Sequence, residues 1–384
     1  MGGTAARADL PSESAGVSFT STRSTTAERL PGCGKGSSVR EMSDLLTEYH
    51  AVRDSGAGVI DLTSRGRILV GGSEAIMFLN GLITNDMKTI AEHRWMPAAF
   101  PNVQGRLIAS VRVIRLRDHD SQPEFLLDTE VATHNAVLKT IERFTMAGDF
   151  RVTDITNDTA MFSVQGNAAL AVGQHVLGKT SGDLARDGVT DAEFDAVKVT
   201  VIRASHTAED GFDVIVDAAH STSILQAFVN AGAIPVGSET FETLRIEAGI
   251  GLYGQDMDET NVVSEANLDD AVSFTKGCYI GQEIIARIKY RGHVAKKLTG
   301  LVLNGKETIA PGSKIKTMDD KEIGRTTSST FSPRLDRPIA LAYVRYEHLV
   351  AGTNVLVGER DLPGEVAELP LVRGSWFAEV GKSA

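Results

Sequence analysis

The sequence predicts an α+β protein that ends in a small all-β domain. From about residue 42 to about residue 290, short helical and strand patterns are mixed without the regular alternation of a βαβ winding. After Gly292, short apolar strands are separated by glycine and proline turns, of which Pro311-Gly312 is the clearest. The length of 384 residues exceeds what one core needs, so two or three domains are expected.

The chain divides into three regions. Residues 1–41 are rich in Ser, Thr, Gly and Ala and lack a hydrophobic period, so a disordered tail is predicted there. Residues 42–290 are predicted to form the α+β region, with two subdomains, and residues 291–384 the β-barrel domain. Helices are expected at 42–54, at 74–79 behind a Ser73 cap, and at 133–144. The expected strands are 59–62, 67–70, 106–116, 124–127, 298–303, 314–316, 323–325, 339–344 and 354–357.

Composition excludes several classes of protein. No run of 18 apolar residues occurs, which argues against a membrane-spanning helix. The net charge of -11 argues against a broad nucleic-acid surface. The two cysteines, Cys33 and Cys278, cannot by themselves close a zinc site or hold an iron–sulfur cluster, so no metal site is predicted. A cytoplasmic location is expected. An organelle is the alternative, because the tail carries arginines and hydroxyls, although its acids oppose a transit peptide.

The densest motif is KGCYIGQEIIAR at residues 276–287. Its second half is predicted to be a short helix, which places Cys278 just ahead of a helix N-terminus and two residues from Lys276. Both features favour a thiolate over a thiol, so Cys278 is a candidate functional thiol. The alternative is a small buried hydrophobic residue. Sequence spacing leaves both open.

The KGCYIGQE string resembles the signature of the YgfZ folate-binding family, within the glycine-cleavage T-protein (aminomethyltransferase) superfamily. Other segments extend the resemblance from about Leu45 to Val357. These are LRIEAG at 244–249 followed by LYG at 252–254, EANL at 265–268, and HTAEDGF at 206–212, which resembles YTGEDGF with His for Tyr and Ala for Gly.

The resemblance implies a ring of two α+β domains, whose segments interleave, and a C-terminal β-barrel around a hole that holds tetrahydrofolate or a derivative. Glu209 would accept the N–H groups of the pterin; an exposed loop acid is the alternative. Arg245 would clamp a carboxylate, or form a surface salt bridge. Tyr253 would wall the pocket or pack the core. The remaining folate-binding residues implied by the signature motif are Lys276, Tyr279, Gln282 and Glu283, with Cys278 acting at the folate or at cluster delivery.

One departure bears on activity. Aminomethyltransferases carry an Asp–Asp pair in a GGIIDDL-like strand, and here the matching places are Ala109 and Ser110. Neither serves as a general acid or base at neutral pH, and no Asp or Glu occurs between Val103 and Leu116. The resemblance therefore implies a folate-binding factor for iron–sulfur cluster assembly or repair, with assembly or client proteins as partners, and not an active aminomethyltransferase. The alternative is a folate-dependent one-carbon transferase or demethylase that recruits another acid.

A basic run interrupts the acidic chain near the predicted domain boundary. Alternation places some of its side chains on one face, where a folate tail, a polyglutamate or an RNA phosphate would fit. A role in tRNA modification is therefore a third hypothesis, and the alternative is a solvated charged face without a ligand. The run consists of Arg287, Lys289, Arg291, Lys296 and Lys297.

Overall fold

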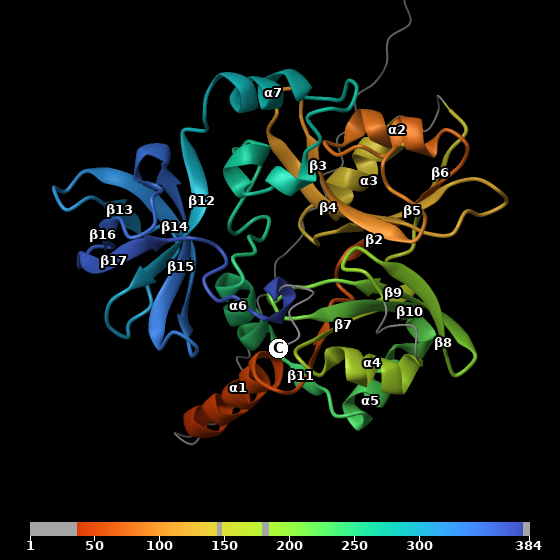
Figure 1. The fold of residues 1–384 in the computed structure, drawn as a ribbon, viewed down its shortest axis with the longest axis horizontal. Coiled ribbons are helices and arrows are strands. Elements are labelled where there is room, and N and C mark those ends of the chain that lie inside the picture. Colours follow the sequence, from red (N-terminus) through yellow and green to blue (C-terminus); the bar gives the residue numbers. More distant parts are fainter. Residues whose placement is uncertain (1–36, 144–147, 179–183, 379–384) are drawn as a thin grey trace, which may run out of the picture.

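The computed structural model describes residues 37–143, 148–178 and 184–378, so Cys33 and most of the predicted tail lie outside the described residues. Two α+β units and a β-barrel are grouped around α6 (Ser238–Glu247) and the segments that follow it (Figure 1). Within the described ranges, no helix has both the length and the apolar character needed to cross a membrane.

The first unit contains a six-stranded sheet, called sheet A. Its strand order is β11-β1-β7-β10-β9-β8. Phe212 of the sheet packs with Phe228 of a covering helix in one buried cluster. The elements are β1 (Gly58–Asp61), β7 (Thr159–Gln165), β8 (Val189–Phe194), β9 (Val197–Arg203), β10 (Gly211–Asp217), β11 (Ile234–Val236), α4 (Ala169–Leu177) and α5 (Ser221–Asn230).

The second unit contains an antiparallel five-stranded sheet, called sheet B, in the order β3-β4-β5-β2-β6. Alternate residues of β4, such as Ala109, Val111 and Val113, enter the core beneath the helices. The elements are β2 (Gly66–Gly71), β3 (Arg94–Pro101), β4 (Leu107–Arg115), β5 (Glu124–Thr129), β6 (Arg151–Asp154), α2 (Ala75–Leu82) and α3 (His134–Glu142).

The two sheets share the chain and a core. β1 belongs to sheet A, β2 to β6 build sheet B, and the chain returns to sheet A at β7. A buried cluster joins Ile60 and Ile202 of sheet A to Ile114 of sheet B, and it includes Val52 of α1 (Ser37–Arg53). The inner faces of both sheets therefore point toward each other.

The barrel closes in the order β12-β15-β14-β13-β16-β17 and has its own apolar core. Ile246 of α6 packs against Leu298 and Leu341, which joins the barrel to the α+β units. The strands are β12 (Lys296–Leu303), β13 (Lys314–Lys316), β14 (Glu322–Ser332), β15 (Arg337–Arg345), β16 (Asn354–Val357) and β17 (Leu362–Ala367).

These observations confirm the predicted fold class, and the local predictions differ in a few places. α1 begins at Ser37, earlier than residue 42. The predicted cap of α2 is wrong: Glu74 occupies the N-cap position, and the Ser73 hydroxyl donates to Asp149 at 2.5 Å. Among the described strands, β3, β6 to β11 and β17 are absent from the predicted ones, and in β3 the reason is that Pro97 and Pro101 are poor strand residues.

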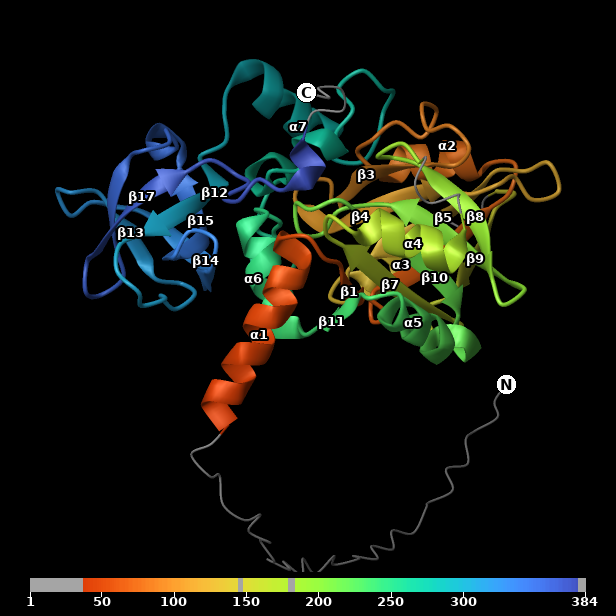
Figure 2. The same cartoon turned by 60° about the horizontal axis from the view of Figure 1, so that its bottom comes forward.

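A buried charge cluster ties the units together at α1, which lies alongside α6 (Figure 2). Arg53 pairs with Glu209 of the β9–β10 loop at 3.0 Å and with Glu247 of α6 at 2.7 Å. The Tyr49 hydroxyl donates to Glu247 at 2.9 Å, and Ser332 of the barrel donates to the same carboxylate. One guanidinium thus compensates two buried carboxylates from different parts of the fold.

Replacing Arg53 is expected to destabilise the protein strongly. Arg53→Met leaves Glu209 and Glu247 buried without their cation, which typically costs about 3–5 kcal/mol. Arg94→Met is the matched control, because Arg94 pairs with Asp187 at 2.7 Å but both side chains are exposed. An exposed pair is worth about 0–1 kcal/mol. Urea unfolding monitored by circular dichroism measures the free energy of unfolding of both variants. Equal losses for the two variants would contradict the stabilising role of Arg53.

Candidate functional site

A cavity of about 410 Å³ lies where the two sheets meet α6 and the segment after it. It draws residues from the end of β1, the end of β5, the β9–β10 loop and α6. The lining residues are Asp61, Leu62, Ser64, Arg65, Glu130, Val131, Ala132, His206, Ser238, Phe241, Glu242, Arg245, Ile250, Gly251, Leu252 and Tyr253.

The walls of this cavity are apolar and accessible. Val131 is 61% exposed, Ile250 39% and Leu252 37%, although each is a large hydrophobic residue. Their clustering around one cavity, with Leu62 and Phe241, distinguishes them from single exposed apolar residues elsewhere. A flat ligand with apolar faces would remove this surface from water.

Glu130 is an incompletely bonded acid in the cavity. It follows β5 directly, and its Oε2 accepts the backbone N–H of Tyr253 at 2.8 Å. Burial raises the pKa of the Glu130 carboxyl, although the Arg65 charge and the Tyr253 N–H act in the opposite direction. Within the residues that the structure describes, its Oε1 has no hydrogen-bond partner.

A chain of charges runs between the two sheets beside the cavity. Arg65 and Arg112 both pair with Asp128 at 2.7 Å, and Arg112 also pairs with Asp213 at 2.6 Å. Burial alone would raise the pKa of Asp213, but the attraction of His206 and Arg112 lowers it well below its usual range. Asp213 therefore stays ionised and accepts a hydrogen bond from the Nε2–H of His206 at 3.0 Å. This fixes the His206 ring, and in the neutral ring Nδ1 becomes the acceptor.

Arg245 lines the cavity, but its guanidinium is fully used by the protein. It donates to both carboxylate oxygens of Glu242 at 2.6 and 2.5 Å and to Asp256 at 2.7 Å. Its other partners are the Ile250 carbonyl at 3.0 Å and the Ser328 hydroxyl at 2.8 Å. The bidentate geometry predicted for a ligand carboxylate is realised on Glu242.

Tyr253 has contacts on two sides. It lines the cavity and also packs in the cluster that contains Leu107 and Met257. Its hydroxyl donates to the Leu107 carbonyl at 3.2 Å.

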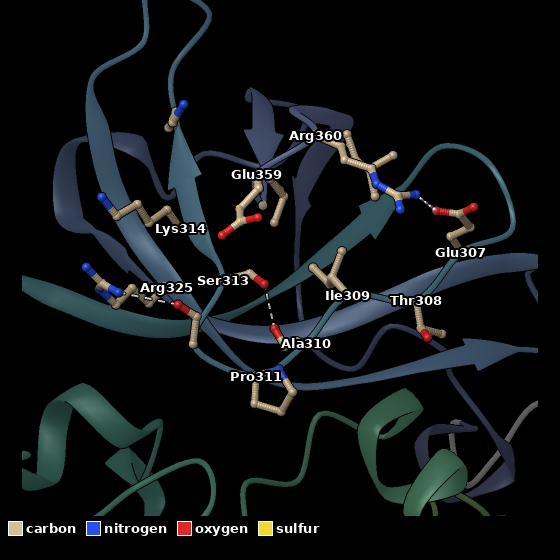
Figure 3. A pocket seen from close by; sticks show the side chains of 15 residues that line it. Glu307, Thr308, Ile309, Ala310, Pro311, Ser313, Lys314, Arg325, Glu359 and Arg360 are labelled. Atoms are coloured by element: carbon tan, nitrogen blue, oxygen red, sulfur yellow. Dashed lines mark hydrogen bonds and ion pairs between the residues drawn. The ribbon is translucent and has the colours of Figure 1, made fainter.

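A larger hollow of about 920 Å³ on the barrel has a different character (Figure 3). Its cations are paired with acids: Arg360 with Glu307 at 2.8 Å, and Lys314 with Glu322 at 3.3 Å. Because its cations are neutralised by the barrel itself, the smaller central cavity is the better candidate for a ligand site.

Comparisons with known proteins agree with this geometry. Residues 25–276 match the GCVT N-terminal domain, and residues 296–372 match the glycine cleavage T-protein C-terminal barrel domain. The chain belongs to the glycine-cleavage T-protein superfamily. It is 31% identical to an aminomethyltransferase of Rubrobacter xylanophilus over 334 residues, which covers 87% of each chain. It is 32% identical to an aminomethyltransferase of Alcanivorax borkumensis, with 85% of this chain and 88% of that one covered.

A solved structure shows the same fold. The glycine cleavage system aminomethyltransferase T from Bartonella henselae has a TM-score of 0.78 at 23% identity, and the match covers 86% of this chain and 90% of that one. At this identity the likeness establishes the architecture alone.

In this member of the T-protein superfamily, β4 carries no acid. Ala109 is buried in the core of sheet B, and Ser110 lies on the opposite face of the strand, as does Arg112. The aspartates expected from the family pattern are thus replaced by a core methyl group and a hydroxyl.

Glu209 is buried and is not among the described lining residues of the cavity. Its Oε1 accepts Arg53, and its Oε2 accepts the N–H of Ser375 at 2.8 Å and the Ser375 hydroxyl at 2.7 Å. Ser375 begins η7 (Ser375–Phe377), in the C-terminal segment that returns from the barrel to sheet A. The pterin-acceptor role stays a prediction, while the observed contacts are structural.

The signature motif lies apart from the cavity, at α7 (Gln282–Arg291), which sits between the barrel and α2 (Figure 1). Lys276 is buried and donates to the carbonyls of Asn80, Ile83 and Asn85 at 2.7, 2.9 and 2.6 Å. These bonds satisfy backbone acceptors at the end of α2. Burial lowers the pKa of Lys276 to about 8.

The other motif residues divide into buried and exposed. Tyr279 packs in the cluster with Leu107, and burial raises its pKa to about 12. Cys278 is an exposed free thiol ahead of α7, as the motif predicts, and Glu283 is exposed in the first turn. Gln282 begins the helix and is partly exposed. None of these residues is among the described lining of the central cavity.

The described part of the basic run is dispersed. Lys289 lies over the Phe274 ring at 5.1 Å, Lys296 over the Tyr343 ring at 4.7 Å, and Lys297 pairs with Asp269 at 2.7 Å. Arg287 is exposed. Among the described residues, no group of three or more His, Cys, Asp and Glu is arranged to hold a metal ion.

The sequence analysis did not predict Glu130 and His206 as site residues, although both line the cavity. One sequence feature could have indicated Glu130: it is an acid that comes soon after a predicted strand and is followed by the apolar residues Val131 and Ala132. His206 is noted only as a departure from the YTGEDGF pattern, and its partner Asp213 lies in the next strand.

Substitution of Glu209 separates its two roles. Glu209→Gln weakens charge-assisted bonds to Arg53 and Ser375, so we expect a loss of about 1.5–3 kcal/mol in the free energy of unfolding. If Glu209 acts only through these structural contacts, tetrahydrofolate affinity, measured by calorimetry below the unfolding range, stays within about twofold of wild type. Ser375→Ala is the companion variant and should lose less stability. A roughly tenfold or greater loss of affinity at wild-type stability would instead support the pterin-acceptor role.

Proposed function

We propose that this protein binds tetrahydrofolate, or a derivative, in the central cavity and does not transfer aminomethyl groups. The observation that carries the proposal is the apolar cavity between the two sheets, built by segments that belong to the T-protein superfamily. A pterin and its benzoyl group are flat, so the exposed side chains of Val131, Ile250 and Leu252 offer suitable walls.

The composition of β4 supports the negative half of the proposal. Its Ala109 and Ser110 offer no proton to a folate nitrogen at neutral pH. A protein that binds folate tightly and lacks this acid would act as a folate-dependent factor and not as an aminomethyltransferase.

We further propose a role in iron–sulfur cluster assembly or repair, as the YgfZ-like motif implies. Cys278 is accessible at the surface, whereas Lys276 and Tyr279 of the same motif are buried. A single exposed thiol does not hold a cluster alone, so the cluster would remain on a partner protein that Cys278 contacts.

Folate-dependent one-carbon transfer is the second candidate. It is favoured by the relatives named aminomethyltransferase and by the His206–Asp213 pair beside the cavity. A histidine oriented by a buried carboxylate is a common acid–base unit, so it offers a proton-transfer group where β4 has none.

A folate titration and a turnover assay on one purified sample test the proposal. Tetrahydrofolate should bind with one-site stoichiometry, and no folate-dependent release of ammonia or of a methylene unit should occur from a free or carrier-bound amine. Absence of binding would overturn the folate proposal. Turnover that is lost in His206→Asn would promote the second candidate.

The role of Cys278 is tested in cells. Cys278→Ser keeps the size of the side chain but gives a far poorer nucleophile and metal ligand. Because the thiol is exposed, the variant should fold and bind tetrahydrofolate normally, yet the activity of iron–sulfur enzymes should fall. Cys33→Ser is the control, since it removes the other thiol of the chain. Wild-type enzyme activity with Cys278→Ser would show that the thiol is dispensable.

A further inference from the structure

We propose that the C-terminal segment 368–378, called the strap, holds the β9–β10 loop (residues 204–210) and with it His206 in the wall of the central cavity. Ser375 is the positioning residue of the strap, and a cavity ligand and the strap stabilise each other. The inference rests on the proposed ligand binding and adds how that site is regulated. No described residue of the strap lines the cavity, so the coupling acts through the loop.

The strap crosses from the barrel to the α+β units and is anchored at both ends. After β17, the backbone N–H of Val372 donates to the Glu247 carbonyl at the end of α6 at 2.9 Å. At the far end, Arg186 donates to the Ala378 carbonyl at 2.7 Å and lies over the Trp376 ring at 5.4 Å. The middle of the strap therefore lies across the β9–β10 loop.

The middle of the strap is bonded to three consecutive residues of the loop. The N–H and the hydroxyl of Ser375 both donate to Oε2 of Glu209, at 2.8 and 2.7 Å. The Ser375 hydroxyl oxygen also accepts the Asp210 N–H at 2.9 Å. The Trp376 N–H donates to the Ala208 carbonyl at 3.1 Å. Two neighbouring strap residues thus fix the course of the loop backbone.

The strap holds the loop in a conformation that the loop sequence disfavours. Ala208 is buried and has a φ of 67°, in the left-handed region that residues with a Cβ rarely adopt. It stands where the YTGEDGF pattern has glycine. A strained residue of this kind persists only where the surrounding contacts impose its conformation. Because the strap bonds to the Ala208 carbonyl and to the two residues after it, release of the strap would let the loop relax.

Relaxation of the loop would move one wall of the cavity. His206 lies two residues before Ala208 and lines the cavity. Its backbone N–H donates to Oε1 of Gln165 at 3.0 Å, and its ring donates to Asp213 at 3.0 Å. These bonds hold the ring in place only while the loop keeps its present course. A ligand that contacts His206 therefore favours the strapped loop, and by linkage the strapped loop favours the ligand.

The test uses the full chain, 5-formyltetrahydrofolate and hydrogen exchange measured by mass spectrometry. In wild type, saturating ligand is expected to slow the exchange of segments 204–210 and 368–378 by about threefold or more. A strap with a purely structural role would exchange at the same rate with and without ligand, since none of its described residues lines the cavity.

A charge placed at Ser375 is expected to open the strap. Ser375→Glu brings a second carboxylate against Glu209, and the two like charges repel. Both segments should exchange about tenfold faster, and the ligand affinity should fall about tenfold, because only the strapped fraction binds well. Phe377→Glu is the matched control, since it adds the same charge to the strap at a side chain that is 48% exposed. Its exchange and affinity should stay within about twofold of wild type.

Ala208→Gly is the rescue variant. Glycine adopts a φ of 67° without strain, so the loop should keep its course without the strap. In the Ser375→Glu background the affinity should return to within about threefold of wild type, while segment 368–378 still exchanges fast. Ser375→Ala removes only the hydroxyl bonds and should lower the affinity by about threefold. This variant keeps the test decisive if Ser375→Glu folds poorly.

The outcomes separate the strap from the proposed function. If 5-formyltetrahydrofolate does not bind wild type, folate binding is overturned, and unchanged exchange of segment 204–210 in unliganded Ser375→Glu would overturn the strap as well. If the ligand binds but leaves the exchange of segment 368–378 unchanged, folate binding stands and the coupling is wrong. Equal losses of affinity in Ser375→Glu and Phe377→Glu, or no rescue by Ala208→Gly, would also overturn the role of the strap.

Discussion

The arrangement of the three units depends on the buried guanidinium of Arg53. It meets Glu209 of sheet A and Glu247 of α6, and Glu247 also accepts Ser332 of the barrel. Without this cation, two buried carboxylates would have no opposite charge beside them, which is costly to a fold. The central cavity is the space left where these units meet, so its shape follows from a contact that does not touch the ligand site.

The fold was largely predictable from sequence, and the site only in part. Helices and strands are predicted from hydrophobic patterns of neighbouring residues, and the family resemblance of the signature segments predicts how these elements are arranged. The partners of individual side chains are not local: Ser375, which occupies Glu209, lies 166 residues away. Likewise the spacing of Lys276 from Cys278 suggested an ammonium beside a thiol, but the Lys276 ammonium is used by three carbonyls near α2. Glu130 can be recognised as a cavity residue only in the folded structure, where the segment containing Tyr253 lies against the end of β5.

The signature motif is explained mostly by packing. Lys276 closes the end of α2, and Tyr279 fills the cluster around Leu107. Gly281 has a φ of 76°, and a Cβ there would lie 2.4 Å from the Asn102 carbonyl oxygen. These three positions are constrained by the fold whatever the protein does. The surface positions Cys278, Gln282 and Glu283 are those at which the motif can carry function, and Cys278 is the one with distinctive chemistry.

The charged groups in and beside the cavity fall into two classes, those already paired within the protein and those with bonding capacity left for a ligand. Arg245 and Glu242 pair with each other, Asp128 and Asp213 pair with arginines, and Asp213 also accepts a hydrogen bond from His206. Glu130 and His206 keep bonding capacity toward the cavity. What a ligand meets is therefore one oriented carboxylate and one ring edge between apolar walls, with no acid on β4. Such a set suits a ligand that carries hydrogen-bond donors, and His206 is a group suited to moving a proton. The proposal of binding without aminomethyl transfer rests on the missing acid of β4, whereas the second candidate, one-carbon transfer, rests on His206.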